Sequence, residues 1–376
     1  MKTLCLLFSL GVLLTSRMYS QGASVHSVQV PGVLQPLSFS TGGRVLVEPD
    51  QADGSFGGKR YTYQWPGTYF EAAFTGDAVD FRVGEGRQML HVSIDGKPVL
   101  PWVSPGPGVY MVGPLPAARH TVRVEVATES QAGPDTFEGF ALPPGGRPAD
   151  APRRAKEIEF IGDSHTVGYG NTSATRGCTP DRVWATTDET QAFGALTARH
   201  YDADYQVNAI SGHGIVRNYN GSAGDPVPVA YPYVLFDRKQ RYEDSAWQPQ
   251  VVVIALGTND FSTPLNPGER WKTREALHAD YEATYSKFLV ELRRRYPGAY
   301  LLLWATDGVN GEIQQEVAKV VAARKAAGET RLGFLPMNGL KMDACDAHPS
   351  LADDRTITAK LIGFMDAQPG IWAGAR

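Results

Sequence analysis

Ile158-Glu159-Phe160-Ile161-Gly162-Asp163-Ser164-His165-Thr166 is the stretch of sequence that indicates how the chain folds. Residues 158–161 have the composition of a buried strand, and a glycine, an acid and a serine follow at once. A serine at the end of a parallel strand lies on the edge of the sheet where open α/β folds hold their ligands. Gly-Asp-Ser is also an ordinary turn sequence, so this stretch alone establishes no function.

Downstream of this stretch, predicted strands alternate with predicted helices, which is typical of a parallel sheet covered by helices. The strands are expected at 158–161, 205–209, 251–256, 300–304 and 332–335. The helices are expected at 273–296, 312–327 and 351–366, of which the first shows clear helical periodicity and stops at Pro297-Gly298. We therefore predict an α/β domain over residues 156–372.

Three short motifs follow predicted strands of this domain. They are Gly162-Asp163-Ser164, Ser211-Gly212-His213-Gly214 and Leu256-Gly257-Thr258-Asn259-Asp260. Because the carboxyl ends of parallel strands meet at one edge, Ser164, Gly212 and Asn259 are expected to lie close together. His348, in Asp346-Ala347-His348-Pro349-Ser350, enters from the loop before the last helix.

These four residues have complementary chemistry. A serine hydroxyl is a weak nucleophile unless a base takes its proton, and histidine titrates near neutrality. His348 is thus the candidate base for Ser164. The N–H groups of Ser164 and Gly212 and the amide of Asn259 are the candidate oxyanion hole.

The order Ser164, Gly212, Asn259, His348 resembles the SGNH (GDSL-like) hydrolase superfamily. The block Gly162-Asp163-Ser164-His165-Thr166-Val167-Gly168-Tyr169-Gly170-Asn171 is similar to that of carbohydrate esterase family 2, as are Tyr63–Thr68 and Cys345–Ser350. This resemblance implies a three-layer SGNH-hydrolase domain, an enzyme, and removal of acetyl groups from plant-type polysaccharides or oligosaccharides. In that family the sugar 6-hydroxyl is preferred.

One position departs from the superfamily pattern. Its members usually carry an aspartate three residues before the histidine, and here that residue is Cys345. Either a displaced acid, Asp343 or Asp346, completes a triad, or a Ser-His dyad operates with a backbone carbonyl holding the ring.

Residues 25–145 show short apolar or aromatic runs broken by Gly, Pro and Asp. The runs His91–Ile94 and Val122–Val126 alternate cleanly, and Asp95-Gly96 is a hairpin-turn signal. This pattern predicts a small β-sandwich of jelly-roll type. The Gly/Pro-rich stretch Pro143–Pro152 is then the linker.

Residues 1–22 have the features of a secretory signal, with Lys2 before the apolar run Leu4–Leu14. The mature protein is therefore expected to be secreted or periplasmic, with no membrane span. The net charge is −4 with both signs interspersed, which argues against a nucleic-acid partner. Nothing in the sequence indicates an obligate protein partner.

No cofactor or metal is expected. His165 and His213 lie beside site residues, but the spacing of possible ligands is not that of a zinc site. Gly168-Tyr169-Gly170 lacks the full nucleotide-loop fingerprint and its lysine. Asp163 is expected to shape the serine turn, and Asp260 to cap the loop that presents Asn259.

Two other functions remain open from the sequence. One is a lipase- or lysophospholipase-like esterase on the same fold, and the other is a catalytically inactive polysaccharide-binding protein. A sugar platform would favour a carbohydrate substrate, and at least one aromatic residue near the site is expected to provide it. The candidates are Trp184, Tyr219, Tyr231, Tyr233, Phe261 and Trp271.

Cys178 and Cys345 are the cysteines that remain after the signal. Cys178 follows the serine loop and Cys345 precedes His348, so the fold brings both to one rim. Export permits oxidation, and we predict a Cys178–Cys345 disulfide. The alternative is two separate buried thiols.

Overall fold

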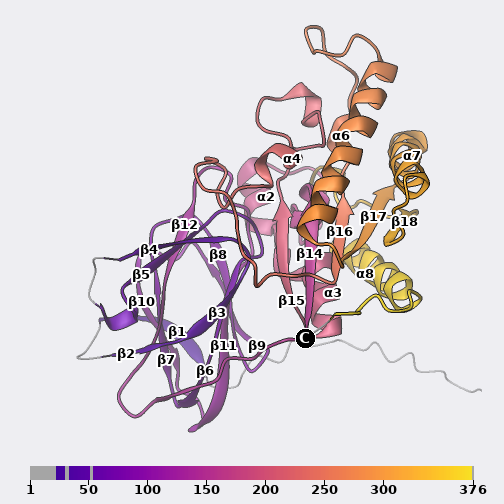
Figure 1. Cartoon of the computed structure of the whole chain (residues 1–376). Helices are drawn as coiled ribbons and strands as arrows, with labels where there is room; N and C mark the ends of the chain where they lie inside the picture. Colours follow the sequence, from indigo (N-terminus) through magenta and orange to yellow (C-terminus); the bar gives the residue numbers. More distant parts are fainter. Residues whose placement is uncertain (1–22, 30–33, 51–53, 375–376) are drawn as a thin grey trace, which may run out of the picture.

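The computed structural model describes residues 23–29, 34–50 and 54–374. In these residues an antiparallel β-sandwich precedes a parallel sheet covered by helices (Figure 1). The predicted fold class is therefore confirmed. The predicted signal at residues 1–22 lies outside the described residues.

The sandwich consists of two antiparallel sheets in the described part of the chain. One has the order β1-β10-β7-β12-β5-β4, with β2 paired to β12, and the other has the order β13-β6-β11-β8-β9, with β3 paired to β6. The strands of the first are β1 (Ser24–Val28), β2 (Gln35–Leu37), β4 (Val45–Pro49), β5 (Lys59–Tyr63), β7 (Val79–Val83), β10 (Gly108–Gly113) and β12 (Asp135–Leu142). Those of the second are β3 (Phe39–Gly42), β6 (Tyr69–Gly76), β8 (Met89–Ile94), β9 (Lys97–Val103), β11 (Ala118–Val126) and β13 (Arg147–Ala149).

Aromatic side chains fill the space between these sheets. Phe70 of β6 stacks on Phe137 of β12, with ring centroids 4.1 Å apart, and Phe81 of β7 is also fully buried. The turn between β8 and β9 is the predicted hairpin, in which Asp95 and Gly96 both have positive φ (52° and 72°). The alternating pattern therefore located the buried face correctly.

The predicted linker is partly wrong. Residues 147–149 form β13, which pairs with β6 at the sheet edge. Proline is tolerated on an edge strand because no neighbour there needs its missing N–H, so Pro148 did not prevent pairing.

The parallel sheet has the order β15-β14-β16-β17-β18. Its strands are β14 (Lys156–Gly162), β15 (Ala203–Ala209), β16 (Val251–Ala255), β17 (Tyr300–Thr306) and β18 (Leu332–Met337). The α-helices are α1 (Ser164–Val167), α2 (Pro180–Thr186), α3 (Phe193–Tyr201), α4 (Val227–Ala230), α5 (Thr258–Phe261), α6 (Arg274–Arg295), α7 (Glu312–Ala326) and α8 (Leu351–Asp366). Short 3₁₀ turns are η1 (Gly54–Phe56), η2 (Glu189–Gln191), η3 (Tyr219–Gly221), η4 (Val309–Gly311) and η5 (Cys345–Ala347).

Helices cover both faces of this sheet. Alternate residues of the strands pack against α6 and α7 on one face and against α3 and α8 on the other. In β16, for example, Ile254 belongs to the first cluster and Val253 to the second. This is the predicted three-layer arrangement, and it leaves the carboxyl ends of β14, β15 and β16 adjacent.

No helix in the described ranges is long and apolar enough to cross a membrane.

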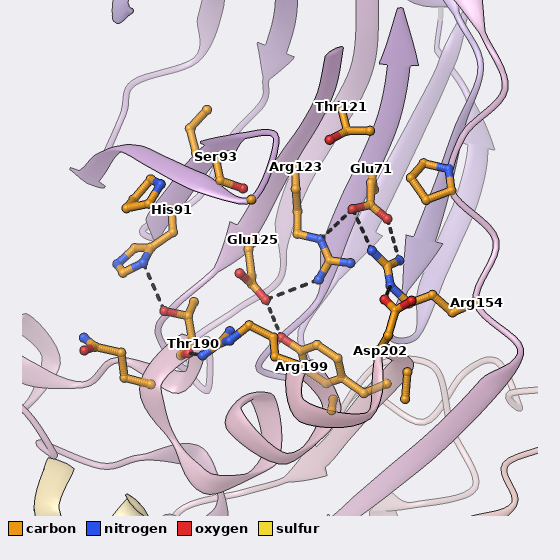
Figure 2. Close-up of a pocket in the computed structure, with 18 residues that line it drawn as sticks. Glu71, His91, Ser93, Thr121, Arg123, Glu125, Arg154, Thr190, Arg199 and Asp202 are labelled. Atoms are coloured by element: carbon orange, nitrogen blue, oxygen red, sulfur yellow. Dashed lines mark hydrogen bonds and ion pairs between the residues drawn. The ribbon is translucent and has the colours of Figure 1, made fainter. Parts of the chain in front are cut away.

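A network of charged residues joins the sandwich to the α/β domain. The network lines a cavity of about 480 Å³ between β6, β8 and β11 on one side and α3 and β15 on the other (Figure 2). Glu71 of β6 binds Arg154 at 2.6 Å and Arg123 at 3.1 Å. Arg154 also reaches Asp202 and Asp204 at the start of β15, at 3.1 and 3.0 Å. Arg154, which lies between the two domains in the chain, therefore ties them together.

Glu71 stays ionised in this network. Burial by itself would raise its pKa, but the hydrogen bonds and charges of Arg154 and Arg123 outweigh burial and lower the pKa of Glu71. Because the pKa of Glu71 is lower in the folded state than in the unfolded state, its ionised form stabilises the fold at pH values above the unfolded pKa of 4.5. This stabilisation is lost as the pH falls through the folded pKa.

We predict that Arg154→Ala lowers the free energy of unfolding by about 1–3 kcal/mol, between the values for exposed and buried ion pairs. Arg119→Ala is the matched control, since Arg119 is exposed and donates to the Asp150 carbonyl. Urea unfolding at pH 7 and below pH 4 measures both. The loss of unfolding free energy in Arg154→Ala should be smaller at the lower pH. Equal losses of unfolding free energy in the two variants would contradict the role of Arg154 in joining the domains.

Candidate active site

Ser164 lies at the carboxyl end of β14, where the strand turns into α1. Asp163 is the N-cap residue of α1, and its Oδ1 accepts the His165 N–H at 3.1 Å. The predicted role of Asp163 in shaping the serine turn is therefore confirmed. As the first residue of α1, Ser164 has an N–H that the helix itself leaves without a partner.

His348 faces Ser164 from the end of η5, which lies between β18 and α8. The Ser164 Oγ is 2.8 Å from His348 Nε2, and His348 Nδ1 is 2.9 Å from the Cys345 carbonyl oxygen. A carbonyl oxygen can only accept, so Nδ1 carries the proton and Nε2 is left to accept from the serine hydroxyl. The backbone thus fixes the tautomer that a base for Ser164 requires.

The two acids considered for a triad make other contacts. Asp343 pairs with Arg176 at 2.9 Å, and the Asp346 Oδ2 accepts from the Tyr169 hydroxyl at 3.1 Å. Of the arrangements left open by the sequence, the geometry is that of a Ser-His pair whose ring is held by a backbone carbonyl.

The loop that carries His348 is fastened to the loop after Ser164. Cys178 and Cys345 form the predicted disulfide, and the Asp346 N–H donates to the Arg176 carbonyl at 2.6 Å. Gly170 has φ +59°, and a Cβ there would lie 2.4 Å from the Cys345 Cβ. Glycine is therefore required at 170 for the serine loop to pass the disulfide.

Aromatic rings enclose the imidazole of His348. The centroid of the Tyr169 ring lies 4.3 Å from that of the imidazole. The centroid of the His165 ring lies 5.5 Å from it, and the two rings meet edge to face. Burial lowers the pKa of His165 to about 3, and the neighbouring His348 adds to the shift. His165 is therefore a neutral ring that packs against His348.

Burial also lowers the pKa of His348 from its usual value, although the Cys345 carbonyl and the charge of Asp346 act in the opposite direction. The imidazole is consequently neutral at pH 7, as a base must be.

Gly212 follows β15 and has φ +83°. Within the part of the chain that the structure describes, no acceptor meets its N–H, while its carbonyl accepts the Tyr219 N–H at 2.8 Å. The expectation for Asp260 is corrected here, because its carboxylate accepts the N–H groups of Ile215, Val216 and Arg217, each at 2.9 Å. Asp260 thus holds the Gly212 loop, whereas the sequence had assigned it to the loop that presents Asn259.

Asn259 lies beside these groups, after β16. Its Nδ2 donates to the Asp163 Oδ2 at 3.2 Å and to the His213 carbonyl at 3.0 Å. Burial, with a smaller contribution from the charges of Asp260 and Glu129, raises the pKa of Asp163 to about 7, although the hydrogen bond from the His165 N–H acts to lower it. The acceptor at Asp163 is therefore a weak one near neutral pH.

Other sequence candidates find structural roles. The His213 Nδ1 lies 2.6 Å from the Asp225 carbonyl, and no group of metal-ligating side chains occurs in the described residues. Asn171 Nδ2 donates to Asp354 of α8 at 3.0 Å, which adds a second tie between the serine and histidine segments.

Of the aromatic candidates, Tyr219 is the most exposed, at 53 %. Tyr231 and Phe261 are buried, and Tyr233, Trp184 and Trp271 are half-buried. The Arg87 guanidinium of the sandwich lies over the Trp184 ring, 4.7 Å from the ring centroid. The Trp271 Nε1 donates to Asp280.

Two further residues at the site, Glu129 and Gln131 of the sandwich, were not predicted. Both contact Ser211, next to Gly212. Neither lies in a motif, and their position depends on how the sandwich docks, so no signal in the sequence could have found them.

Both parts of the chain match known families. Residues 55–152 match the N-terminal domain of carbohydrate esterase 2, and residues 160–357 match the GDSL-like lipase/acylhydrolase family.

Similar proteins agree with these matches. An acetylxylan esterase/glucomannan deacetylase of Cellvibrio japonicus (strain Ueda107) is 44 % identical over 96 % of this chain and 97 % of the relative. A solved carbohydrate esterase whose active site displays divergent catalytic and non-catalytic binding functions has TM-score 0.84 at 44 % identity, covering 90 % of this chain and 100 % of the other. A family two carbohydrate esterase from Clostridium thermocellum in complex with cellohexaose has TM-score 0.75 at 27 % identity, covering 89 % and 100 %.

We predict that Asp346→Asn moves the acid limb of kcat/KM for nitrophenyl acetate to lower pH. The Asp346 charge favours the protonated imidazole, so its removal lowers the pKa of His348 further. Asp346 is exposed, and the shift should diminish in high salt. Asp343→Asn is the control, because that acid pairs with Arg176. A shift of the limb to higher pH, or the same shift in both variants, would contradict this electrostatic assignment.

Proposed function

The chain belongs to carbohydrate esterase family 2 and is a homologue of acetylxylan esterases, and from this premise we propose that it is a serine esterase that removes O-acetyl groups from plant-type polysaccharides or their oligosaccharides. The observation that carries the proposal is the 2.8 Å contact between Ser164 Oγ and His348 Nε2.

In the proposed reaction, Ser164 Oγ attacks the acetyl carbonyl carbon while His348 Nε2 takes the hydroxyl proton. Collapse of the tetrahedral intermediate breaks the bond to the sugar oxygen, which leaves with that proton. Water then attacks the acetyl-serine and gives a proton to His348, which returns it to Ser164 Oγ as the acyl bond breaks and acetate is released.

The oxyanion would be met by the N–H groups of Ser164 and Gly212 and by the Asn259 amide. Of the two hydrogen bonds that Asn259 Nδ2 donates, the one to Asp163 is longer than the one to the His213 carbonyl. Its acceptor is a carboxyl whose pKa is about 7. The oxyanion is the stronger acceptor, so it would replace Asp163 as the partner of this N–H.

A carbohydrate substrate is supported by the relatives and by Tyr219. One relative is named for xylan and glucomannan, and another was solved with cellohexaose. Tyr219 is half exposed, its N–H is bound to the Gly212 carbonyl, and its ring is available to stack on a sugar beside the acetyl group. We propose the sugar 6-hydroxyl as the preferred position, as in the family.

Export is part of the proposal. The signal-like residues 1–22 and the Cys178–Cys345 disulfide both favour an oxidising compartment. A secreted or periplasmic enzyme would also meet polysaccharide directly.

We predict that Ser164→Ala lowers kcat on nitrophenyl acetate by roughly 10⁴-fold or more while leaving the melting temperature unchanged. Mass spectrometry of acetylated xylan and glucomannan oligosaccharides should show loss of acetyl groups with the native enzyme and none with the variant. Faster turnover of long-chain nitrophenyl esters than of the acetate would indicate a lipase-like esterase instead, and no turnover of either would indicate a binding protein.

We predict that Tyr219→Ala raises KM for an acetylated oligosaccharide several-fold, the worth of roughly 1 kcal/mol of stacking. KM for nitrophenyl acetate should stay the same, because that ester lacks the sugar. Tyr219→Phe keeps the ring and serves as the control. A similar rise in KM for both esters would mean that Tyr219 supports the loop and does not bind sugar.

A further inference from the structure

The loop 127–134, between β11 and β12 of the sandwich, reaches the catalytic edge of the parallel sheet. Glu129 Oε1 accepts the Ser211 N–H at 2.6 Å. Gln131 Nε2 donates to the Ser211 carbonyl at 3.0 Å and to Glu129 Oε1, also at 3.0 Å. Two side chains of the sandwich therefore bind both backbone polar groups of the residue before Gly212.

The contact from Gln131 bears directly on the Gly212 N–H. The Ser211 carbonyl and the Gly212 N–H belong to one planar trans peptide, so they point in opposite directions. Holding the carbonyl towards Gln131 consequently aims the N–H away from it. Glu129 fixes the preceding peptide in the same way, through the Ser211 N–H.

The space where a Cβ on Gly212 would lie is open. Among the described residues, no atom beyond the two chain neighbours lies within 4 Å of the position that a Cβ on Gly212 would occupy, and φ of +83° is a conformation that glycine leaves readily. Hydrogen bonds must therefore orient the peptide. The next peptide, between Gly212 and His213, is held by two hydrogen bonds: the Tyr219 N–H donates to the Gly212 carbonyl at 2.8 Å, and the His213 N–H donates to the Ile210 carbonyl at 3.2 Å.

The loop 127–134 is itself well anchored. Buried Gln64 donates to the Ser130 carbonyl at 3.1 Å and accepts the Phe236 N–H at 2.9 Å, so one side chain joins this loop to the hydrolase domain. The Glu189 N–H donates to the Ala127 carbonyl at 2.9 Å. The loop can thus act as a rigid support for Ser211.

We propose that Glu129 and Gln131 are positioning residues of the oxyanion hole, through which the sandwich aims the Gly212 N–H at the reacting carbonyl. This rests on the proposed function, which makes that N–H an oxyanion donor. The sandwich is then a working part of the esterase site.

Gln131→Met removes the donor at nearly constant size, and Gln131 is exposed, so folding should be unaffected. Loss of a whole oxyanion donor costs roughly 10²–10³ in kcat, and a misaimed one should cost less. We expect kcat on nitrophenyl acetate to fall roughly tenfold with KM and melting temperature unchanged. Inactivation by a nitrophenyl phosphonate, whose tetrahedral adduct places an oxygen in the same hole, should slow by the same factor.

Substitutions at Glu129 separate hydrogen bonding from charge. Glu129→Gln keeps an oxygen that accepts the Ser211 N–H and should retain most of kcat. Glu129→Ala removes that oxygen, and its kcat should fall as far as that of Gln131→Met. Gln248→Met is the matched control, because Gln248 is an exposed glutamine that donates to a backbone carbonyl, that of Ser245, elsewhere.

Native kcat in Gln131→Met, or equal losses in Glu129→Gln and Glu129→Ala, would overturn the proposal. A fall in kcat in Gln248→Met equal to that in Gln131→Met would overturn it as well. These outcomes are distinct from failure of the proposed function, which would appear as activity in Ser164→Ala.

Discussion

The hydrogen bond from His348 Nδ1 to the Cys345 carbonyl is the contact on which the chemistry of this site depends. In many serine hydrolases a carboxylate orients the histidine and also stabilises its positive charge. A carbonyl orients the ring equally well, but it carries no net charge. The imidazolium must therefore be stabilised by weaker means, and the charge of exposed Asp346 is one that favours it. The position of the carbonyl matters correspondingly more, which explains why the disulfide is formed by the same residue that supplies it.

The proposed catalytic groups come from segments that are positioned by different forces. Ser164 is placed by the hydrogen-bond register of the parallel sheet, since β14 is paired on both sides. The disulfide ties the histidine loop covalently to the serine loop. A hydrogen bond from Asn171 to Asp354 links the same two segments. The Gly212 loop is held by side chains that bind its backbone, with Asp260 on the hydrolase side and Glu129 and Gln131 on the sandwich side. The site thus depends on the docking of two domains that have separate cores.

The way each segment is held in place explains which site residues could be predicted from the sequence. Parallel strands bring their carboxyl ends to one edge, so Ser164, Gly212 and Asn259 were predictable from strand positions, and the pairing of Cys178 with Cys345 followed from the same topology. The choice between an acid and a backbone carbonyl as the partner of His348 Nδ1 stayed open, because a backbone carbonyl leaves no residue-specific signal. Asp260 was assigned to the wrong loop, since a sequence does not show which of two packed loops a carboxylate faces. Glu129 and Gln131 were missed because domain docking has no local pattern.

The buried acids around the site make the geometry costly to the fold. Burial raises the pKa of Asp163 to about 7 and that of Asp354 to about 8, against an ordinary value of 3.8 for each. A carboxyl with a raised folded pKa binds its proton more tightly in the folded chain, so stability falls as the pH rises from 3.8 towards the folded value. Closing a loop with a sequence separation of 167 contributes about 5 kcal/mol in the chain-entropy account and offsets much of this loss. The disulfide therefore does more than place the Cys345 carbonyl. It offsets part of the cost of burying Asp163, which contacts Asn259. A protonated Asp163 would not compete as an ion with the charges formed during the proposed reaction.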